Sequence, residues 1–150
     1  MTHWTERHKT LLAVFVLLRR ADGKILLIRR ANTGYMDGKL GLPAGHAEGN
    51  EPAELALVRE AAEEVDVVLD PKDLRLVLTS HRLAEEGGYE YIDLYFETAT
   101  WQGEPRNAEP NKCSEVLWID PAQLPDDVIP VVRTALAHIA AGEPYFSIGF

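Results

Sequence analysis

The first third of the chain carries a hydrophobic pattern typical of β-strands. Residues 10–18 and 24–30 are rich in leucine, isoleucine and valine, and the turn-forming stretch 21–23 separates them. Two such runs joined by a short turn predict a β-hairpin. Residues 31–39 include an asparagine and two glycines and indicate a loop, which leads into a short extended segment at residues 40–43.

A helical pattern follows a loop over residues 44–51. Pro52 lies in the expected first turn, where a missing N–H does no harm, and Asn50 or Glu51 is the expected cap. The helix is expected to end near Val65-Asp66. At about 100° per residue, its apolar and acidic side chains fall on roughly opposite faces. The apolar face holds Leu55, Val58, Ala61, Ala62 and Val65, and the acidic face holds Glu60, Glu63 and Glu64.

The second half of the chain predicts more strands and a final helix. Strands are expected at residues 74–81, 91–98 and 115–119. Asp126 or Asp127 is expected to cap a helix that runs to about residue 141 and is ended by Gly142. The aromatic tail, residues 145–150, is expected to pack back on the fold or against a second subunit, so a homodimer stays open.

These elements suit one layered domain of the α/β or α+β class. The chain has 150 residues, of which 46% are hydrophobic, enough for a single sizeable core. We therefore expect one domain over residues 1–150, with no internal repeat and no linker. Periodicity predicts the elements but does not predict the order of the strands in the sheet.

Charge and cysteine content narrow the possible partners. The formal net charge of −9 argues against nucleic acid or an anionic membrane as a partner, because binding to phosphate-rich surfaces normally needs a basic patch. A small phosphorylated substrate stays possible if a bound metal inverts the local charge. The longest apolar run, residues 11–18, is too short to span a bilayer. The single Cys113 excludes an internal disulfide and fits a reducing, cytoplasmic compartment.

The acidic helix face suggests either a solvated surface or a metal site. Glutamates three and four residues apart are neighbours on a helix and repel one another when ionised. Water can screen that repulsion, as on many acidic helix faces, or a cation can compensate it. Ligands that offer only oxygen favour a hard metal such as Mg²⁺, Mn²⁺ or Ca²⁺.

The spacing around the helix resembles a known motif. Residues 45–67 follow the pattern G-x5-E-x7-R-E-U-x-E-E-x-G-U, where U is bulky and apolar. This stretch resembles the box of the Nudix hydrolases, which cleave a nucleoside diphosphate linked to another group. Asp66 replaces the closing glycine and Asn50 an earlier one, and both residue types tolerate the left-handed conformation. The matching residues are Gly45, Glu51, Arg59, Glu60, Glu63, Glu64 and Val67.

The resemblance implies a fold and a set of site residues. It implies an α/β/α sandwich with a mixed sheet and Mg²⁺, or Mn²⁺, at the acidic face of the box helix. Glu63 or Glu64 is the expected general base, Arg59 orients the glutamates, and Gly45 and Glu51 are structural. The implied metal ligands are Glu60, Glu63, Glu64, Glu48 and the backbone carbonyl of Ala44.

A second resemblance concerns the substrate. Residues 107–113 read N-x-E-P-x-K-C, a segment similar to that of MutT-like hydrolases acting on nucleoside triphosphates. It implies release of a nucleoside monophosphate and pyrophosphate. Among the basic residues near the site, Arg29, Arg30 and Lys39, we expect Arg29 or Lys39 to hold a phosphate. Tyr91 is the expected partner of the base, with Tyr35 and Trp101 as alternatives.

Three other functions share much of this evidence. A nucleotide-sugar or dinucleotide pyrophosphatase would carry the same box and differ in its loops. A catalytically inactive nucleotide sensor would have no need of every box carboxylate, and all of them are present. An isomerase acting on a prenyl diphosphate would need a cysteine in the site, whereas Cys113 lies far along the chain.

Overall fold

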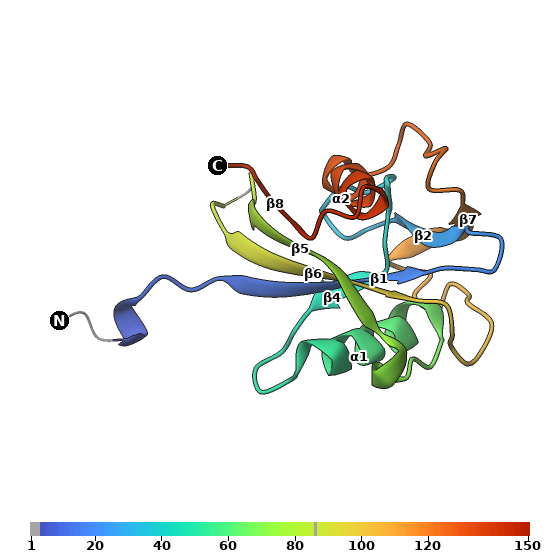
Figure 1. Ribbon diagram of the computed structural model, residues 1–150, viewed down its shortest axis with the longest axis horizontal. Coiled ribbons are helices and arrows are strands. Elements are labelled where there is room, and N and C mark those ends of the chain that lie inside the picture. Colours follow the sequence, from blue (N-terminus) through green and yellow to red (C-terminus); the bar gives the residue numbers. More distant parts are fainter. Residues whose placement is uncertain (1–3, 86) are drawn as a thin grey trace.

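The computed structural model describes residues 4–85 and 87–150 and forms a layered α/β structure (Figure 1). The strands are β1 Leu11–Leu18, β2 Ile25–Arg30, β3 Leu40–Gly41, β4 Ala44–His46, β5 Arg75–Leu83, β6 Glu90–Thr98, β7 Cys113–Ile119 and β8 Tyr145–Ile148. The helices are α1 Ala53–Val65 and α2 Pro130–Ala140, with short 3₁₀ turns at Trp4–Glu6 and Pro71–Asp73.

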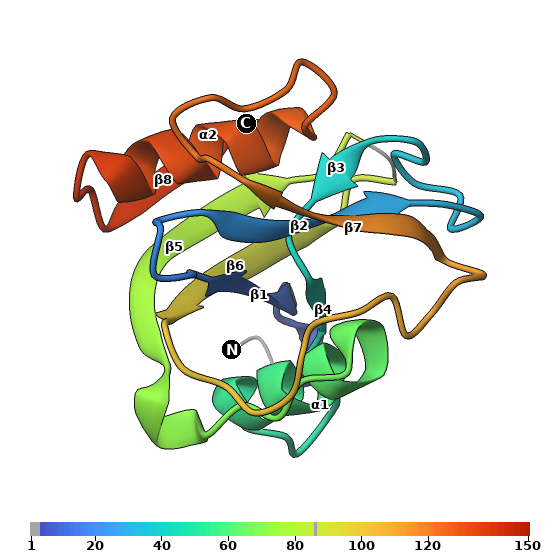
Figure 2. The same ribbon diagram turned by 90° about the vertical axis from the view of Figure 1, so that its right-hand side faces the viewer.

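The strands form two sheets between the helices. The larger sheet has the order β4-β1-β6-β5-β8, and the smaller has the order β3-β2-β7. The pairs β1–β6 and β5–β8 are parallel and the others antiparallel, so the larger sheet is mixed. Figure 2 shows α1 covering one face of the larger sheet and α2 the other, with the smaller sheet beside α2. The expected α/β/α sandwich with a mixed sheet is confirmed.

The predicted hairpin between the first two strands is wrong. A single bridge, Arg19 to Ile25, joins their ends, and β1 pairs along its whole length with β6 instead. The reason is burial on both sides: Val14 and Val16 point into the core under α1, and Leu17 points into the core under α2. A strand with two apolar faces belongs inside a sheet that is covered on both sides.

Each helix packs over its own core. Side chains of β1, β2 and β6 alternate between the two cores, as the period of two in a strand requires. The core under α1 includes Val14, Val16, Leu18, Leu57, Ala61, Val65 and Phe96. The core under α2 includes Leu17, Leu27, Leu78, Tyr95, Val132, Leu136 and Phe146.

The start of α1 differs from the prediction. Pro52 is the N-cap rather than a first-turn residue, and no side chain caps the helix. Asn50 has a φ of 63°, while Glu51 accepts a hydrogen bond from the N–H of Glu48 at 3.0 Å. The end agrees with the prediction, because Asp66 takes the left-handed conformation with φ 58° and ψ 42°.

The start of α2 also differs from the prediction. The helix begins at Pro130 with Ile129 as the N-cap, and neither predicted aspartate caps it. Asp127 instead accepts a hydrogen bond from Arg29 at 2.6 Å. Asp127 therefore forms an ion pair with Arg29 of β2 and does not cap α2.

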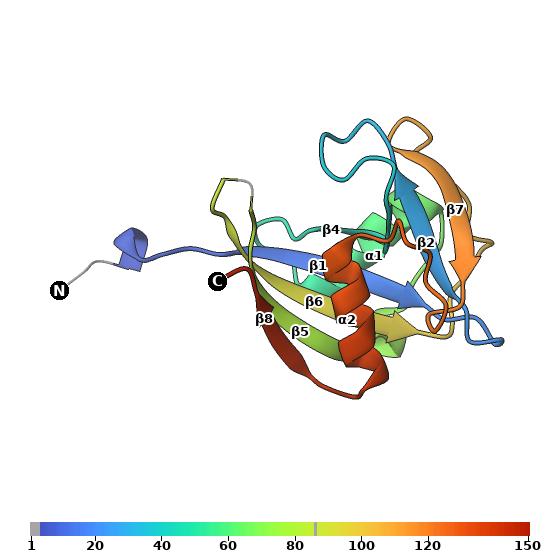
Figure 3. The same ribbon diagram turned by 90° about the horizontal axis from the view of Figure 1, so that it is seen from above.

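The 3₁₀ turn Trp4–Glu6 and the C-terminus lie on the same side of the molecule (Figure 1). The aromatic tail packs back on its own domain, since β8 pairs in parallel with β5 from Thr79 to Arg82. Figure 3 shows α2 lying across the β5 and β8 side of the larger sheet. Within residues 4–85 and 87–150, no helix combines the length and apolar character needed to cross a membrane.

Candidate active site

Two glutamates of α1 lie against the short edge strand β4. Residues 60 and 64 are one helical turn apart and therefore project from the same side of α1. A Cβ atom on Gly45 would lie 2.1 Å from the Glu60 carboxyl carbon, so only a glycine lets this carboxylate come so close to the strand. The Glu60 side chain is 16% exposed, and burial raises its pKa although Arg59 opposes the shift.

Glu64 is bound directly to the same strand. The backbone N–H of Ala44 donates to its Oε2 at 3.0 Å. Burial raises the pKa of Glu64 to about 8; the N–H bond opposes that shift, and the nearby Glu60 and Glu109 reinforce it. Two partly buried carboxylates whose pKa values are both raised form a site that a cation would stabilise.

Arg59 connects the glutamates of the box. Its Nε and Nη2 donate to the two oxygens of Glu51 at 2.9 and 3.0 Å, and its Nη1 donates to Glu60 Oε1 at 2.9 Å. Nη2 also donates to the carbonyl of His46 at 3.2 Å, which ties α1 to β4. These hydrogen bonds hold the pKa of Glu51 at about 2, so Glu51 stays ionised as the counter-charge of Arg59.

The remaining box glutamates are more exposed than Glu60. The Glu63 side chain is 51% exposed and lies 3.6 Å from Arg59 Nη1, and that of Glu48 is 72% exposed and lies 3.9 Å away. The predicted single acidic face is therefore split between exposed and buried carboxylates. The apolar face is shifted too, because Ala56 and Leu57 are buried while Leu55 is 46% exposed.

The loop before β7 brings a carboxylate that was not among the predicted site residues. Glu109 lies close enough to raise the pKa of both Glu60 and Glu64. The loop is held at the end of α1, where the N–H of Ala108 donates to the carbonyl of Glu64 at 3.1 Å. Glu109 belongs to the N-x-E-P-x-K-C segment, whose resemblance implies a substrate class but assigns Glu109 no role in the site.

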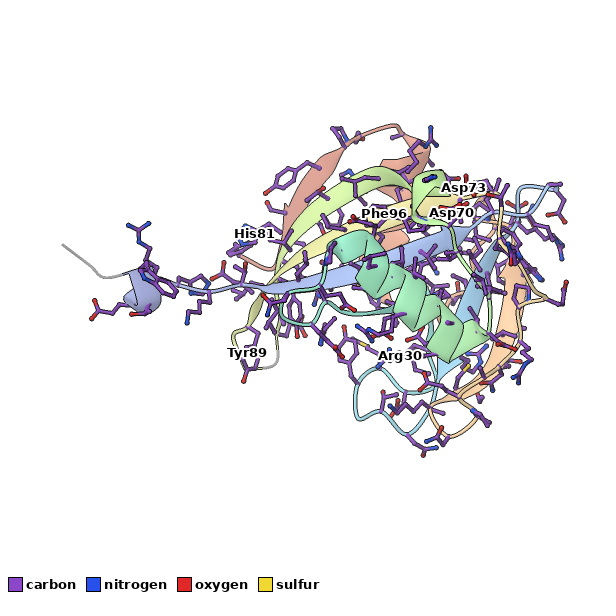
Figure 4. All side chains as sticks on the ribbon, turned by 90° about the horizontal axis from the view of Figure 1, so that it is seen from below. Arg30, Asp70, Asp73, His81, Tyr89 and Phe96 are labelled. Atoms are coloured by element: carbon purple, nitrogen blue, oxygen red, sulfur yellow. The ribbon has the colours of Figure 1, made fainter. Side chains whose placement is uncertain are left out.

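The three candidate phosphate-binding cations have different surroundings. Arg29 is bonded to Glu115 and to Asp127, each at 2.6 Å, so a phosphate would have to displace one of these carboxylates. Lys39 is exposed and lies near Asp127. Arg30 acts electrostatically on Glu64, and Figure 4 shows it beside α1.

The predicted base contact lies on the opposite face of β4 from Gly45. The ring of Tyr91 is 5.5 Å from that of His46, and the Arg82 guanidinium lies 4.2 Å from the Tyr91 ring centroid. Tyr35 is 37% exposed and close enough to Arg82 to act on it electrostatically. Trp101 stacks on Trp118 at 5.9 Å, which accounts for its aromatic character without a ligand.

The residues around α1 fit a hard divalent cation such as Mg²⁺. Glu60, Glu64 and the Ala44 carbonyl supply only oxygen, and burial, reinforced by neighbouring carboxylates, raises the pKa of both glutamates, so a cation would stabilise their charged forms. In the part of the chain that the structure describes, no three histidine, cysteine or acidic side chains already converge as a metal-binding group. Glu60 is paired with Arg59, and Glu64 with the Ala44 N–H.

Comparison with known proteins agrees with this geometry. The family model described as NUDIX domain matches residues 9–139. The chain is similar to the 8-oxo-dGTP diphosphatase of Escherichia coli (strain K12), with 29% identity over 119 residues that cover 77% of this chain and 88% of that protein. It is also similar to the crystal structure of a MutT NUDIX hydrolase from Burkholderia pseudomallei, with a TM-score of 0.78, 28% identity, and coverage of 87% of this chain and 98% of that one. A NUDIX hydrolase from Nitrosomonas europaea has the same fold, with a TM-score of 0.75, 23% identity, and coverage of 91% and 93%.

Proposed function

The chain belongs to the NUDIX family and is a MutT-like Nudix hydrolase, and we propose that it converts a nucleoside or deoxynucleoside triphosphate into the monophosphate and pyrophosphate in the presence of Mg²⁺. Nudix hydrolases generally use divalent metal ions. The similarity to a protein named 8-oxo-dGTP diphosphatase supports a triphosphate substrate, and the acidic site supports a metal. The single observation that carries the proposal is the placement of Glu60 and Glu64, partly buried against β4.

The proposed ligands of the metal are oxygens around α1 and β4. Glu60 and Glu64 both lie against β4, where the Ala44 N–H binds Glu64, and the Ala44 carbonyl, Glu63, Glu48 and the additional Glu109 can complete the set. When bound, the cation neutralises charge on the phosphate oxygens and lowers the pKa of a water molecule.

The protein's own residues have separate proposed roles. Arg59 positions Glu60 through its Nη1 while Glu51 fixes the guanidinium from the other side. Glu64 or Glu63 accepts the proton of the attacking water. Arg30 is the proposed phosphate partner, since a guanidinium can form two parallel hydrogen bonds with phosphate oxygens.

The test is a substrate panel with product identification. The purified protein is incubated with Mg²⁺ and canonical nucleoside triphosphates, 8-oxo-dGTP, nucleotide sugars and dinucleotides, and the products are separated by anion-exchange chromatography. We expect monophosphate and pyrophosphate in equal amounts from a triphosphate. Cleavage confined to nucleotide sugars or dinucleotides would overturn the substrate class, and binding without turnover would indicate a nucleotide sensor.

Two matched variants of α1 separate chemistry from folding. Glu64→Gln removes a proposed ligand or base and should lower kcat by two orders of magnitude or more, the range expected when one catalytic group is lost. Glu54→Gln removes the same charge from an exposed position in the first turn of α1 and should leave kcat unchanged. A folded Glu64→Gln protein with normal turnover would remove Glu64 from the catalytic set.

A further inference from the structure

A buried polar network lies on the face of the larger sheet away from α1. Asp93 on β6 and Ser80 on β5 are both 0% exposed, and the Ser80 hydroxyl donates to Asp93 Oδ2 at 2.9 Å. Arg82 donates to the same carboxylate from Nε and from Nη2, each at 2.9 Å. A buried carboxylate is costly unless it is paired and hydrogen-bonded, so this network holds Arg82 in one orientation.

That orientation leaves one edge of the Arg82 guanidinium available. Asp93 takes the side formed by Nε and Nη2, so the end formed by Nη1 and the second hydrogen of Nη2 points elsewhere. Nη1 has no hydrogen-bond partner among residues 4–85 and 87–150. The guanidinium stacks on the Tyr91 ring at 4.2 Å, and the side chain is 16% exposed. A planar fork held in this way is ready to donate two parallel hydrogen bonds to a ligand.

The register of the sheet relates Arg82 to the candidate active site. Tyr91 is directly opposite Arg82 in the β5–β6 pairing, and its ring approaches His46 on β4 at 5.5 Å. Residues 44 and 46 share this face, while Gly45 between them faces Glu60. Three strand spacings separate β4 from β5, roughly 14 Å at about 4.8 Å each. Because β4 is the edge strand of the larger sheet, a nucleoside with its phosphates beside α1 has to pass around this edge to reach Arg82, which stacks on Tyr91 on the other face.

We propose that Arg82 selects the base of the substrate by donating two hydrogen bonds to a base edge with two adjacent acceptors. The inference rests on the proposed function, because it assumes a nucleotide with its phosphates beside α1. Guanine offers such an edge in O6 and N7, and cytosine offers one in O2 and N3. The edges of adenine and thymine alternate donors with acceptors. Oxidation of guanine at C8 turns N7 into a donor and removes the pair on that edge.

The first test changes the substrate and leaves the protein intact. We measure kcat/KM for dGTP, dCTP, dATP and dTTP, and expect dGTP or dCTP to exceed both others by about tenfold or more, because one bidentate arginine contact discriminates by roughly 1–3 kcal/mol. If dGTP is preferred, 7-deaza-dGTP, which lacks the N7 acceptor, should lose about that factor. If dCTP is preferred, 3-deaza-dCTP should lose it. Equal turnover of a preferred nucleotide and its deaza analogue would overturn the proposal.

The second test changes the fork. Arg82→Lys keeps a cation beside Asp93 but has no planar pair of donors, so the penalty for the deaza analogue should disappear. Arg75→Lys on the same strand is the control, because Arg75 is 76% exposed and pairs with Glu97. If Arg82→Lys lowers turnover of every nucleotide by one factor and keeps the deaza penalty, Arg82 is only structural. Should this variant fail to fold, Arg82→Gln combined with Asp93→Asn removes the fork without leaving a buried charge.

Binding of products separates this inference from the proposed function. Calorimetric titration with dGMP, dCMP and dAMP reports base preference without any hydrolysis. Selective binding that Arg82→Lys abolishes, in a protein that hydrolyses no triphosphate, would uphold the role of Arg82 and refute the proposed reaction. Hydrolysis of triphosphates without base preference would uphold the proposed reaction and refute the role of Arg82. Absence of both hydrolysis and base preference would overturn the two proposals together.

Discussion

Gly45→Ala tests the contact between β4 and α1 with the smallest possible change. The added Cβ would lie 2.1 Å from the Glu60 carboxyl carbon, whereas ordinary contact begins at 3.4 Å. The carboxyl carbon must therefore move by about 1.3 Å, the difference between these two distances. A displacement of about 1 Å in a catalytic group can cost roughly 100-fold in rate. We expect kcat to fall by about that factor.

The stability of Gly45→Ala, by contrast, should change little. Gly45 does not have a positive φ, so alanine can adopt its backbone conformation. The atoms in the way, Cγ, Cδ and Oε1 of Glu60, belong to a flexible side chain rather than to the backbone. Replacing glycine by alanine at such a position stabilises by about 0.4–1 kcal/mol through the unfolded chain. The free energy of unfolding should thus stay within about 1 kcal/mol of the wild-type value while activity is lost.

The assay pairs steady-state hydrolysis with urea denaturation, and Gly49→Ala is the matched control. A Cβ at Gly49 meets nothing within 4 Å, so both its activity and its stability should stay near those of the wild type. Normal turnover in Gly45→Ala would refute the idea that the approach of Glu60 to β4 organises the site. A Gly45→Ala protein that is folded only at low denaturant would show that the contact serves the fold rather than the chemistry.

Three further predictions concern metal, acid and a buried hydroxyl. Mg²⁺ should raise the melting temperature, because a cation relieves repulsion among Glu60, Glu64 and Glu109, and an unchanged melting temperature in calorimetry would speak against a metal at this site. Burial opposes ionisation of Glu97, but Arg19 and Arg75 outweigh it and hold its pKa below the usual range. The stabilisation is therefore present above the ordinary carboxyl pKa and is lost as pH falls through the folded value, so Glu97→Gln should lower the urea midpoint at pH 7 and have less effect in acid. The Tyr95 hydroxyl is buried without a hydrogen-bond partner among the described residues, so Tyr95→Phe should be neutral or stabilise by about 1 kcal/mol in the same assay, and a loss of stability would indicate a hidden partner.

Local sequence was a good guide to the elements and a poor one to their partners. The turn after β1 is where the sequence predicts it, with the N–H of Arg20 bonded to the carbonyl of Lys24 at 2.8 Å. The strand nevertheless pairs with β6, more than seventy residues further along the chain. Both faces of β1 are apolar, so the strand needs a central position in a sheet that is covered on both sides. The residues of the turn do not indicate which strand will be its neighbour.

The arginines of β2 show why the site was predicted only in part. Neighbouring residues on a regular strand point to opposite faces, but the pairing of β2 with β7 shifts register between Arg29 and Arg30. Leu26 and Ile28 point into the core under α1, while Leu27 points into the core under α2. Arg30 acts electrostatically on Glu64 of α1, whereas Arg29 is bonded to Glu115 and Asp127. Because both faces of β2 are apolar, periodicity gave no reason to choose between the arginines.

The box glutamates were predictable because their spacing lies within one helix. Glu60 and Glu64 are four residues apart, and any helix brings such side chains together. Glu109 was not recognised as a site residue because it reaches α1 through the loop before β7, and its closeness depends on hydrogen bonds such as that from Ala108 to Glu64. Contacts of this kind depend on the tertiary structure and leave no periodic signal.

The alternation along β4 has a consequence for how such an enzyme can evolve. Gly45 faces the carboxylates, whereas positions 44 and 46 face the sheet surface that carries Tyr91 and Arg82. Selection for a new base can therefore act on the side chains at 44 and 46 without disturbing the hydrolytic machinery. The two faces of this three-residue strand thus serve different properties. Single substitutions at 44 or 46 can change the preference for a base while the residues proposed to cleave the nucleotide stay the same.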